Sequence, residues 1–170
     1  GLGDINNRGD GSTEMGNNLS VVDLGSGRTA ASITTGTMHT CAILDNSAIK
    51  CWGEGEDGRL GTGKNRNEES PPDSINDLGN GRTAMGITAG DAHTCAILDN
   101  SSIKCWGANA SGQLGLGDDD NRGDNSNEMG DILTVVDLGS GRTAKAIVAG
   151  GSHTCAILDN SAINCWGRSN

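Results

Sequence analysis

Short apolar runs, each ended by turn residues, make up the hydrophobic pattern of this chain. The run Cys-Ala-Ile-Leu at 41–44 meets an Asp-Asn-Ser turn signal, and a second short run follows at 48–52. Further upstream, the runs at 21–24 and 31–34 flank a Gly-Ser-Gly turn. No stretch of ten residues keeps a helical period free of glycine. The pattern therefore predicts an all-β chain in which two hairpins, or four short strands, follow one another.

This unit is repeated three times. Nine residues starting at His39 return unchanged at His93 and His153, and each copy runs on into Cys-Trp-Gly. Four short strands in about 50 residues is the size of one propeller blade. We therefore expect three four-stranded blade-like repeats in one continuous array, open or completed by neighbouring subunits. The expected boundaries are 1–53 for repeat 1, 54–107 for repeat 2 and 108–170 for repeat 3, which is truncated at its C-terminal end.

The two ends of the chain are related in sequence. Residues 1–30 match residues 115–144 at 23 of 30 positions. Cut in this way, the segment could be joined head to tail to copies of itself through a short connection. We expect either a piece of a longer array or the unit of an assembly that continues the array, because each repeat has an apolar face that only stacking can bury.

Six cysteines form three pairs, each ten residues apart. If the hairpin turn lies on 45–47, Ile43 faces Ile49 and Cys41 faces Cys51. Residues directly opposed in this way have Cα atoms roughly 4.5–5.5 Å apart, within disulfide range. The alternatives are reduced buried thiols and metal binding, although the spacing is not Cys-x-x-Cys. We predict three disulfides, Cys41–Cys51, Cys95–Cys105 and Cys155–Cys165.

Composition favours a cross-linked, non-catalytic protein. The chain has 28 Gly, three Trp, and neither Phe nor Tyr, so small side chains must form most of the core. The net charge of −10 repels phosphate backbones, and no apolar run approaches the roughly 20 residues that span a bilayer. We expect no nucleic-acid partner and no membrane insertion. Packing at blade or subunit boundaries falls to the tryptophans Trp52, Trp106 and Trp166.

The three histidines, His39, His93 and His153, occupy the same place in their repeats. One imidazole per repeat cannot by itself build a catalytic triad or a zinc site. We therefore expect each ring to hydrogen-bond to backbone beside its strand rather than to act in catalysis, and we expect no enzyme.

Two acidic loops offer alternating oxygen side chains around a glycine, loosely like a calcium loop. The alternative is a solvated turn, and the loops carry an Arg and lack a distant Glu. The chain is expected to need no cofactor unless Ca²⁺ is bound here. The candidate ligands are Asp4, Asn6 and Asp10 in one loop and Asp118, Asp120 and Asp124 in the other.

The string Gly-x-x-His-Thr-Cys-Ala-Ile-Leu-Asp-Asn-Ser, followed by Cys-Trp-Gly and Gly-x-Leu-Gly-x-Gly, is clearest at 90–117. It resembles the repeat of the regulator of chromosome condensation family, whose four-stranded blades usually close a ring of seven. The segment 121–131, with the later Asp-Leu-Gly-x-Gly-Arg-Thr-Ala, looks like repeats of the mastigoneme protein of green algae, which builds flagellar hairs. The residues at 7–16 fit this pattern as well, whereas repeat 2 departs from it at 65–72.

The resemblance implies a structural subunit of an extracellular filament, assembled by head-to-tail stacking of disulfide-stapled repeats. The alternative is a protein- or glycan-binding propeller module excised from a longer secreted protein. Secretion would make glycans possible on the three Asn-x-Ser sequons, and algal wall proteins often carry sugars on prolines. An unmodified loop is the alternative for the prolines. The candidate attachment sites are Asn18, Asn100, Asn109, Pro71 and Pro72.

Overall fold

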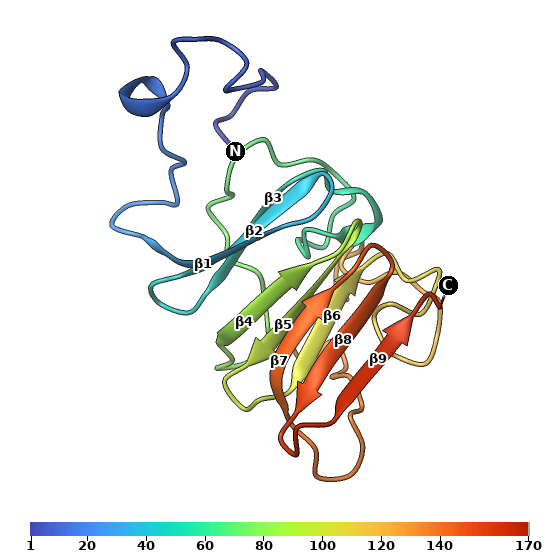
Figure 1. Cartoon of the computed structure of the whole chain (residues 1–170). Coiled ribbons are helices and arrows are strands. Elements are labelled where there is room, and N and C mark those ends of the chain that lie inside the picture. The colour runs from blue at the N-terminus through green and yellow to red at the C-terminus, as the bar shows by residue number, and fades with distance from the viewer. Residues whose placement is uncertain (170) are drawn as a thin grey trace.

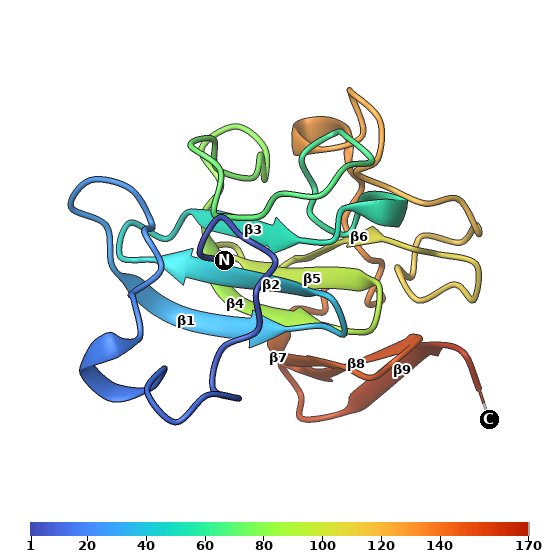
Figure 2. The same cartoon turned by 90° about the horizontal axis from the view of Figure 1, so that it is seen from above.

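The computed structural model describes residues 1–169, in which the chain forms three antiparallel three-stranded sheets. The all-β prediction is confirmed. In each sheet the strands follow chain order, and the three sheets form an open array, with the segment before the first strand lying beside the first sheet (Figures 1 and 2). The strands are β1 (Ala30–Thr35), β2 (His39–Leu44) and β3 (Ile49–Gly53); β4 (Ala84–Ala89), β5 (His93–Leu98) and β6 (Ile103–Gly107); and β7 (Ala144–Ala149), β8 (His153–Leu158) and β9 (Ile163–Gly167).

Helical structure in the described part of the chain is limited to three short 3-10 turns. They are η1 (Gly16–Asn18), η2 (Glu56–Gly58) and η3 (Gly130–Ile132). Residues 1–169 contain no helix long and apolar enough to cross a bilayer.

The expected fourth strand is not formed within residues 1–169. Residues 21–24, predicted to be a strand, are not part of any strand. The reason is visible in the later repeats, where the same segment bonds to the preceding sheet: Asn76 N–H donates to the Ile49 carbonyl and Val136 N–H to the Ile103 carbonyl, both at 2.9 Å. On the other side of each hairpin only single bridges form, Gly53 with Glu68 and Gly107 with Arg122.

The second hairpin has the predicted register. Cys41 pairs with Cys51 and Ile43 with Ile49, and the equivalent pairs recur in both later sheets. The turn closes with Ser47 at φ 63°, the left-handed conformation that a three-residue hairpin loop uses at its last position. All three predicted disulfides are formed, with Cα–Cα distances of 4.1 Å. A cross-link of this short span contributes about 2–3 kcal/mol.

An ion pair at the turn explains why the Gly-Ser-Gly-Arg segment keeps a fixed distance from each hairpin. The Arg82 guanidinium contacts the Asp99 carboxylate at 3.1 Å, and Asp99 N–H donates to the Thr83 carbonyl at 2.9 Å. The same pairing joins Arg28 to Asp45 and Arg142 to Asp159. An insertion between the arginine and the turn would break this contact, so length varies elsewhere in the repeat.

The hydrophobic core lies between sheets rather than inside one. The first disulfide, Ile43 and Ile49 pack against Leu98 and Trp106 of the second repeat. A second cluster repeats this arrangement between the second and third sheets. Each disulfide therefore staples a hairpin and also contributes apolar surface to the contact with the next repeat.

The burial of Trp106 predicts a large effect of its removal. Its side chain is fully buried, whereas Trp166 is half-buried. Trp106→Ala should lower the free energy of unfolding by about 3–5 kcal/mol, measured by urea denaturation, because it leaves a cavity between two sheets. The matched variant Trp166→Ala should cost clearly less, and equal losses in both variants would contradict this role for the inter-sheet core.

Candidate functional site

The most elaborate polar arrangement in the molecule joins neighbouring repeats, and we call it the joint. At the first joint, the Thr94 hydroxyl donates to the Arg59 carbonyl at 3.0 Å. The His39 ring then donates from Nε2 to the same hydroxyl, at 2.9 Å. The Trp106 indole N–H also donates to the Arg59 carbonyl, at 3.2 Å. One carbonyl in the loop that follows the first sheet thus anchors a threonine and a tryptophan of the second sheet.

The second joint repeats this chemistry. His93 Nε2 lies 2.9 Å from the Thr154 hydroxyl. Thr154 and Trp166 both donate to the Gln113 carbonyl, each at 3.0 Å. Because the two joints agree atom for atom, the arrangement is a property of the repeat.

The expectation that each histidine bonds to neighbouring backbone was wrong. His39 and His93 instead reach the threonine of the following repeat, and His153 is exposed. A signal for this was present, since Thr follows His in every copy. It could not be interpreted without knowing that the threonine of one repeat faces the histidine of the one before.

Protonation of the two buried histidines is opposed by their surroundings. The Thr94 hydroxyl hydrogen is used on Arg59, so the His39 ring must carry its hydrogen on Nε2. Nδ1 of His39 and of His93 is buried without a hydrogen-bond partner among the described residues. Burial, the largest cause, lowers the pKa of both rings from 6.5 to about 4. Both are therefore neutral at pH 7.

Backbone approach at the joint requires glycine. A Cβ on Gly61 would lie 2.8 Å from Trp106 Nε1, and one on Gly115 would lie 2.7 Å from Trp166 Nε1. Both glycines also have positive φ, 62° and 71°. The last glycine of each Gly-x-Leu-Gly run therefore allows the next tryptophan to pack directly against the backbone.

The outermost repeats each carry an unfilled half of a joint. On the third sheet Ile157 is 42% and Ile163 is 67% exposed, whereas Ile97 and Ile103 at the same places are 6% and 0% exposed. On the first repeat Val22 is 37% exposed, whereas the equivalent Val136 is 6% exposed. The joint surfaces are thus present at both sides of the array and uncovered there.

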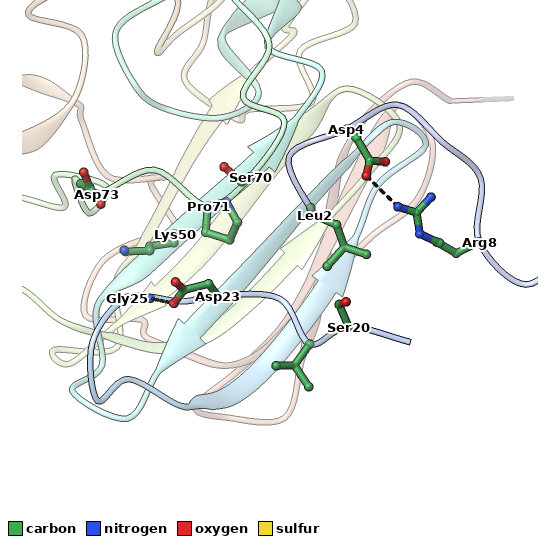
Figure 3. Close-up of a pocket in the computed structure, with 12 residues that line it drawn as sticks. Leu2, Asp4, Arg8, Ser20, Asp23, Gly25, Lys50, Ser70, Pro71 and Asp73 are labelled. Carbon is green, nitrogen blue, oxygen red and sulfur yellow. Dashed lines mark hydrogen bonds and ion pairs between the residues drawn. The ribbon is translucent and has the colours of Figure 1, made fainter. Parts of the chain in front are cut away.

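The predicted calcium ligands are not assembled into a cation site. In each loop an arginine forms an ion pair with one of the candidate ligands. Arg8 contacts Asp4, and Arg122 contacts Asp118, each at 2.6 Å. Figure 3 shows the Asp4–Arg8 pair at a pocket of about 430 Å³ beside Lys50 and Pro71. Within residues 1–169, no group of three His, Cys, Asp or Glu side chains is placed to hold a metal ion. Calcium binding by Asp4, Asn6, Asp10, Asp118, Asp120 and Asp124 therefore stays a prediction from the sequence.

The five candidate attachment sites differ in accessibility. Asn109 is fully buried, with its side-chain amide donating to Asp118 and its carbonyl oxygen accepting from Leu114 N–H, so it cannot be reached in the folded chain. Asn18 and Asn100 are exposed. Pro71 and Pro72 are half-buried.

Comparison with known sequences identifies the repeat. Two profiles of the regulator of chromosome condensation (RCC1) repeat match this chain, one at 86–113 and 144–170, the other at 51–97. Together they cover 63 residues at 51–113 and 27 residues at 144–170, which is 90 of the 170. The chain belongs to the RCC1 repeat family. The finer resemblance to mastigoneme repeats is not part of this match.

Longer proteins share these RCC1 repeats. Ultraviolet-B receptor UVR8 of Arabidopsis thaliana is 32% identical over 150 residues, 88% of this chain and 31% of the relative. The fold is similar to yeast RCC1 (Prp20) in its complex with Kap60, with a TM-score of 0.67 and 19% identity over 88% of this chain and 32% of that one. It is also similar to the ectodomain of the Physcomitrella patens receptor kinase CR4, with a TM-score of 0.53 and 24% identity over 84% and 31%. The chain spans about a third of each.

The neutral joint histidines predict that acid destabilises these RCC1 repeats. Because the folded-state pKa of His39 and His93 lies below the ordinary value, the unfolded state binds more protons. The free energy of unfolding should therefore fall by about 2 kcal/mol per histidine between pH 6.5 and 4.5. Urea denaturation at a series of pH values measures this. The variant His39→Gln/His93→Gln should lose most of this dependence, and an unchanged slope would contradict the assignment.

The disulfides should differ in their resistance to reduction. Cys41, Cys51, Cys95 and Cys105 are 0% exposed, whereas Cys165 is exposed and Cys155 half-buried. Under native conditions, dithiothreitol should reduce Cys155–Cys165 at least about tenfold faster than the other two, because exchange requires access to a sulfur. Alkylation followed by peptide mass mapping gives the order. Simultaneous reduction of all three would mean that reduction proceeds through global unfolding.

Proposed function

We propose that this chain is a structural subunit of an extracellular filament in which RCC1 repeats stack head to tail. The observation that carries the proposal is the pair of uncovered half-joints, one on the first repeat and one on the third. Contiguous apolar surface of this kind usually marks an interaction site. Three disulfides support an oxidising environment, which for this proposal is the cell exterior.

The proposal assigns no catalytic role to the repeats. The side chains that recur in each repeat are used in packing: cysteines in cross-links, and histidine, threonine and tryptophan in the joints. A role in assembly requires only these packing contacts between repeats. The resemblance of 7–16 and 121–131 to mastigoneme repeats supports a filament as the form of this assembly.

Sugars fit the proposal as surface modifications. Asn18 and Asn100 lie exposed on loops and are the sequons that we propose for N-linked glycans. The half-buried Pro71 and Pro72 are the proline candidates, and Pro71 lines the pocket of Figure 3. None of these positions lies on a strand, so attachment would leave the sheets intact.

A second candidate function is a protein- or glycan-binding module within a closed propeller. The specific observation in its favour is that the chain spans only 31% of UVR8 and 32% of the yeast RCC1 chain. In that case further repeats of the same polypeptide would cover both half-joints. The two candidates differ in what covers them, a second copy or the same chain.

Self-association of the purified chain tests the leading proposal. At 0.15 M salt, sedimentation velocity should show species of two, three and more chains that grow with concentration, and electron microscopy should show linear fibrils. The expectation rests on heterologous contacts that do not close, which propagate an open array. A chain that stays monomeric at about 100 μM, well above the dissociation constant of ordinary specific contacts, would reject the filament and favour the propeller module.

A further inference from the structure

We infer that copies of this chain join through a third joint, in which the first repeat of one copy covers the third sheet of another. This inference rests on the filament proposal and specifies its contact. We call Cys155, Ile157, Ile163 and Cys165 the tail face, and Val22, Leu24 and Ala30 the head face.

The chain contains its own template for this contact. Residues 1–53 correspond to residues 115–167, which lie 114 positions later in the chain. Within them, residues 21–30 are identical to 135–144. The second of these segments is already docked, since Val136, Leu138 and Ala144 pack against the second sheet and are 6%, 8% and 5% exposed. The head face presents the same three side chains in the same order, and there Val22 and Ala30 are exposed and Leu24 is half-buried.

The surface that receives this segment is also duplicated. On the second sheet it consists of Cys95, Ile97, Ile103 and Cys105, which are at most 6% exposed. The tail face has the same residue types at the equivalent positions of β8 and β9. A hollow of about 300 Å³ lies here, lined by side chains of β7, β8 and β9 that include Ala146, Val148 and Ile163.

Polar groups on the two faces match as well. In the joint between the second and third sheets, His93 bonds to Thr154, Ala144 N–H donates to the Ser101 carbonyl, and Val136 N–H donates to the Ile103 carbonyl. The equivalent groups are His153, Ser161 and Ile163 on the tail side. On the head side they are Thr40, Ala30 and Val22, so these three bonds of the template have matching partners in the third joint.

One substitution sets the third joint apart from the two internal joints. Thr34 and Thr88 accept a hydrogen bond from the backbone of the next repeat, from Ala89 N–H at 3.1 Å and Ala149 N–H at 3.0 Å. Val148 stands at this place in the third repeat and cannot accept one. Its exposed side chain, 62% accessible, offers apolar area instead. The third joint therefore lacks one hydrogen bond of the internal joints and offers apolar area in its place.

The geometry gives the assembly a direction. Head and tail faces are different surfaces, so one contact between them leaves one of each free for a further copy, and the array grows unless the rotation between copies closes a ring. The net charge of −10 opposes association of two copies at low salt. At 0.15 M salt the Debye length is about 8 Å, so this repulsion is screened and the apolar contact determines whether two copies associate.

A complementation experiment tests this contact. Ile163→Glu disables the tail face, and Val22→Glu disables the head face, because each would bury an unpaired carboxylate. Each variant alone should associate at least about tenfold more weakly than the parent chain, since charge burial costs more than the about 1.4 kcal/mol of a tenfold change. An equimolar mixture should form a one-to-one dimer and stop there, because each variant retains the face that the other lacks. Sedimentation velocity measures all three samples, and thermal melting checks that both variants fold.

A matched control uses an exposed residue outside both faces. Ile5 is 89% exposed, and its equivalent Asp119 stays exposed at the template joint, so Ile5→Glu should assemble like the parent chain. If the parent chain itself remains monomeric, the filament proposal fails. If the parent assembles but Ile163→Glu and Val22→Glu assemble equally well, or their mixture gives no dimer, the filament stands and this head-to-tail contact is wrong.

Discussion

Burial of the disulfide-bearing face of each sheet is the constraint on which the rest of this structure depends. A three-stranded sheet of this size has no helix or second sheet of its own to cover it, and the chain supplies no Phe or Tyr to thicken its core. The cluster around Cys41–Cys51 is completed by residues that follow the first repeat, among them Leu98 and Trp106. Stability is therefore shared between neighbours, as in solenoids, and a repeat without a following neighbour exposes Ile157 and Ile163.

The joint combines this apolar contact with a directional polar one. A carbonyl of the Gly-x-Leu-Gly run accepts from the threonine and the tryptophan of the next repeat, and the threonine accepts from a histidine. This fixes the register of one sheet on another, which apolar contact alone would leave free. The neutral ring of His39 is a requirement of this geometry, because a buried imidazolium would need an acceptor at Nδ1 and none is there among the described residues.

Much of each repeat could be predicted because its contacts are local. The Cys41–Cys51 pairing follows from the position of one turn, and hairpin register then fixes every opposed residue. The predictions that were wrong concern partners distant in sequence. Residues 21–24 look like a strand but bond to a different repeat in later copies, and the histidine partner lies 55 residues away.

The third repeat differs from the first two at one position of its first strand, and this difference has a physical consequence. In the two internal joints a threonine on the first strand, Thr34 or Thr88, binds the backbone of the following repeat. Val148 replaces it on the third sheet, whose face bearing Ile157 and Ile163 is uncovered. An unpaired hydroxyl on a surface that is sometimes exposed and sometimes covered gains little, whereas a valine contributes apolar area whenever the surface is covered. A single side chain thus exchanges a hydrogen bond for apolar area on the third sheet, while the hairpin, the disulfide and the histidine stay unchanged.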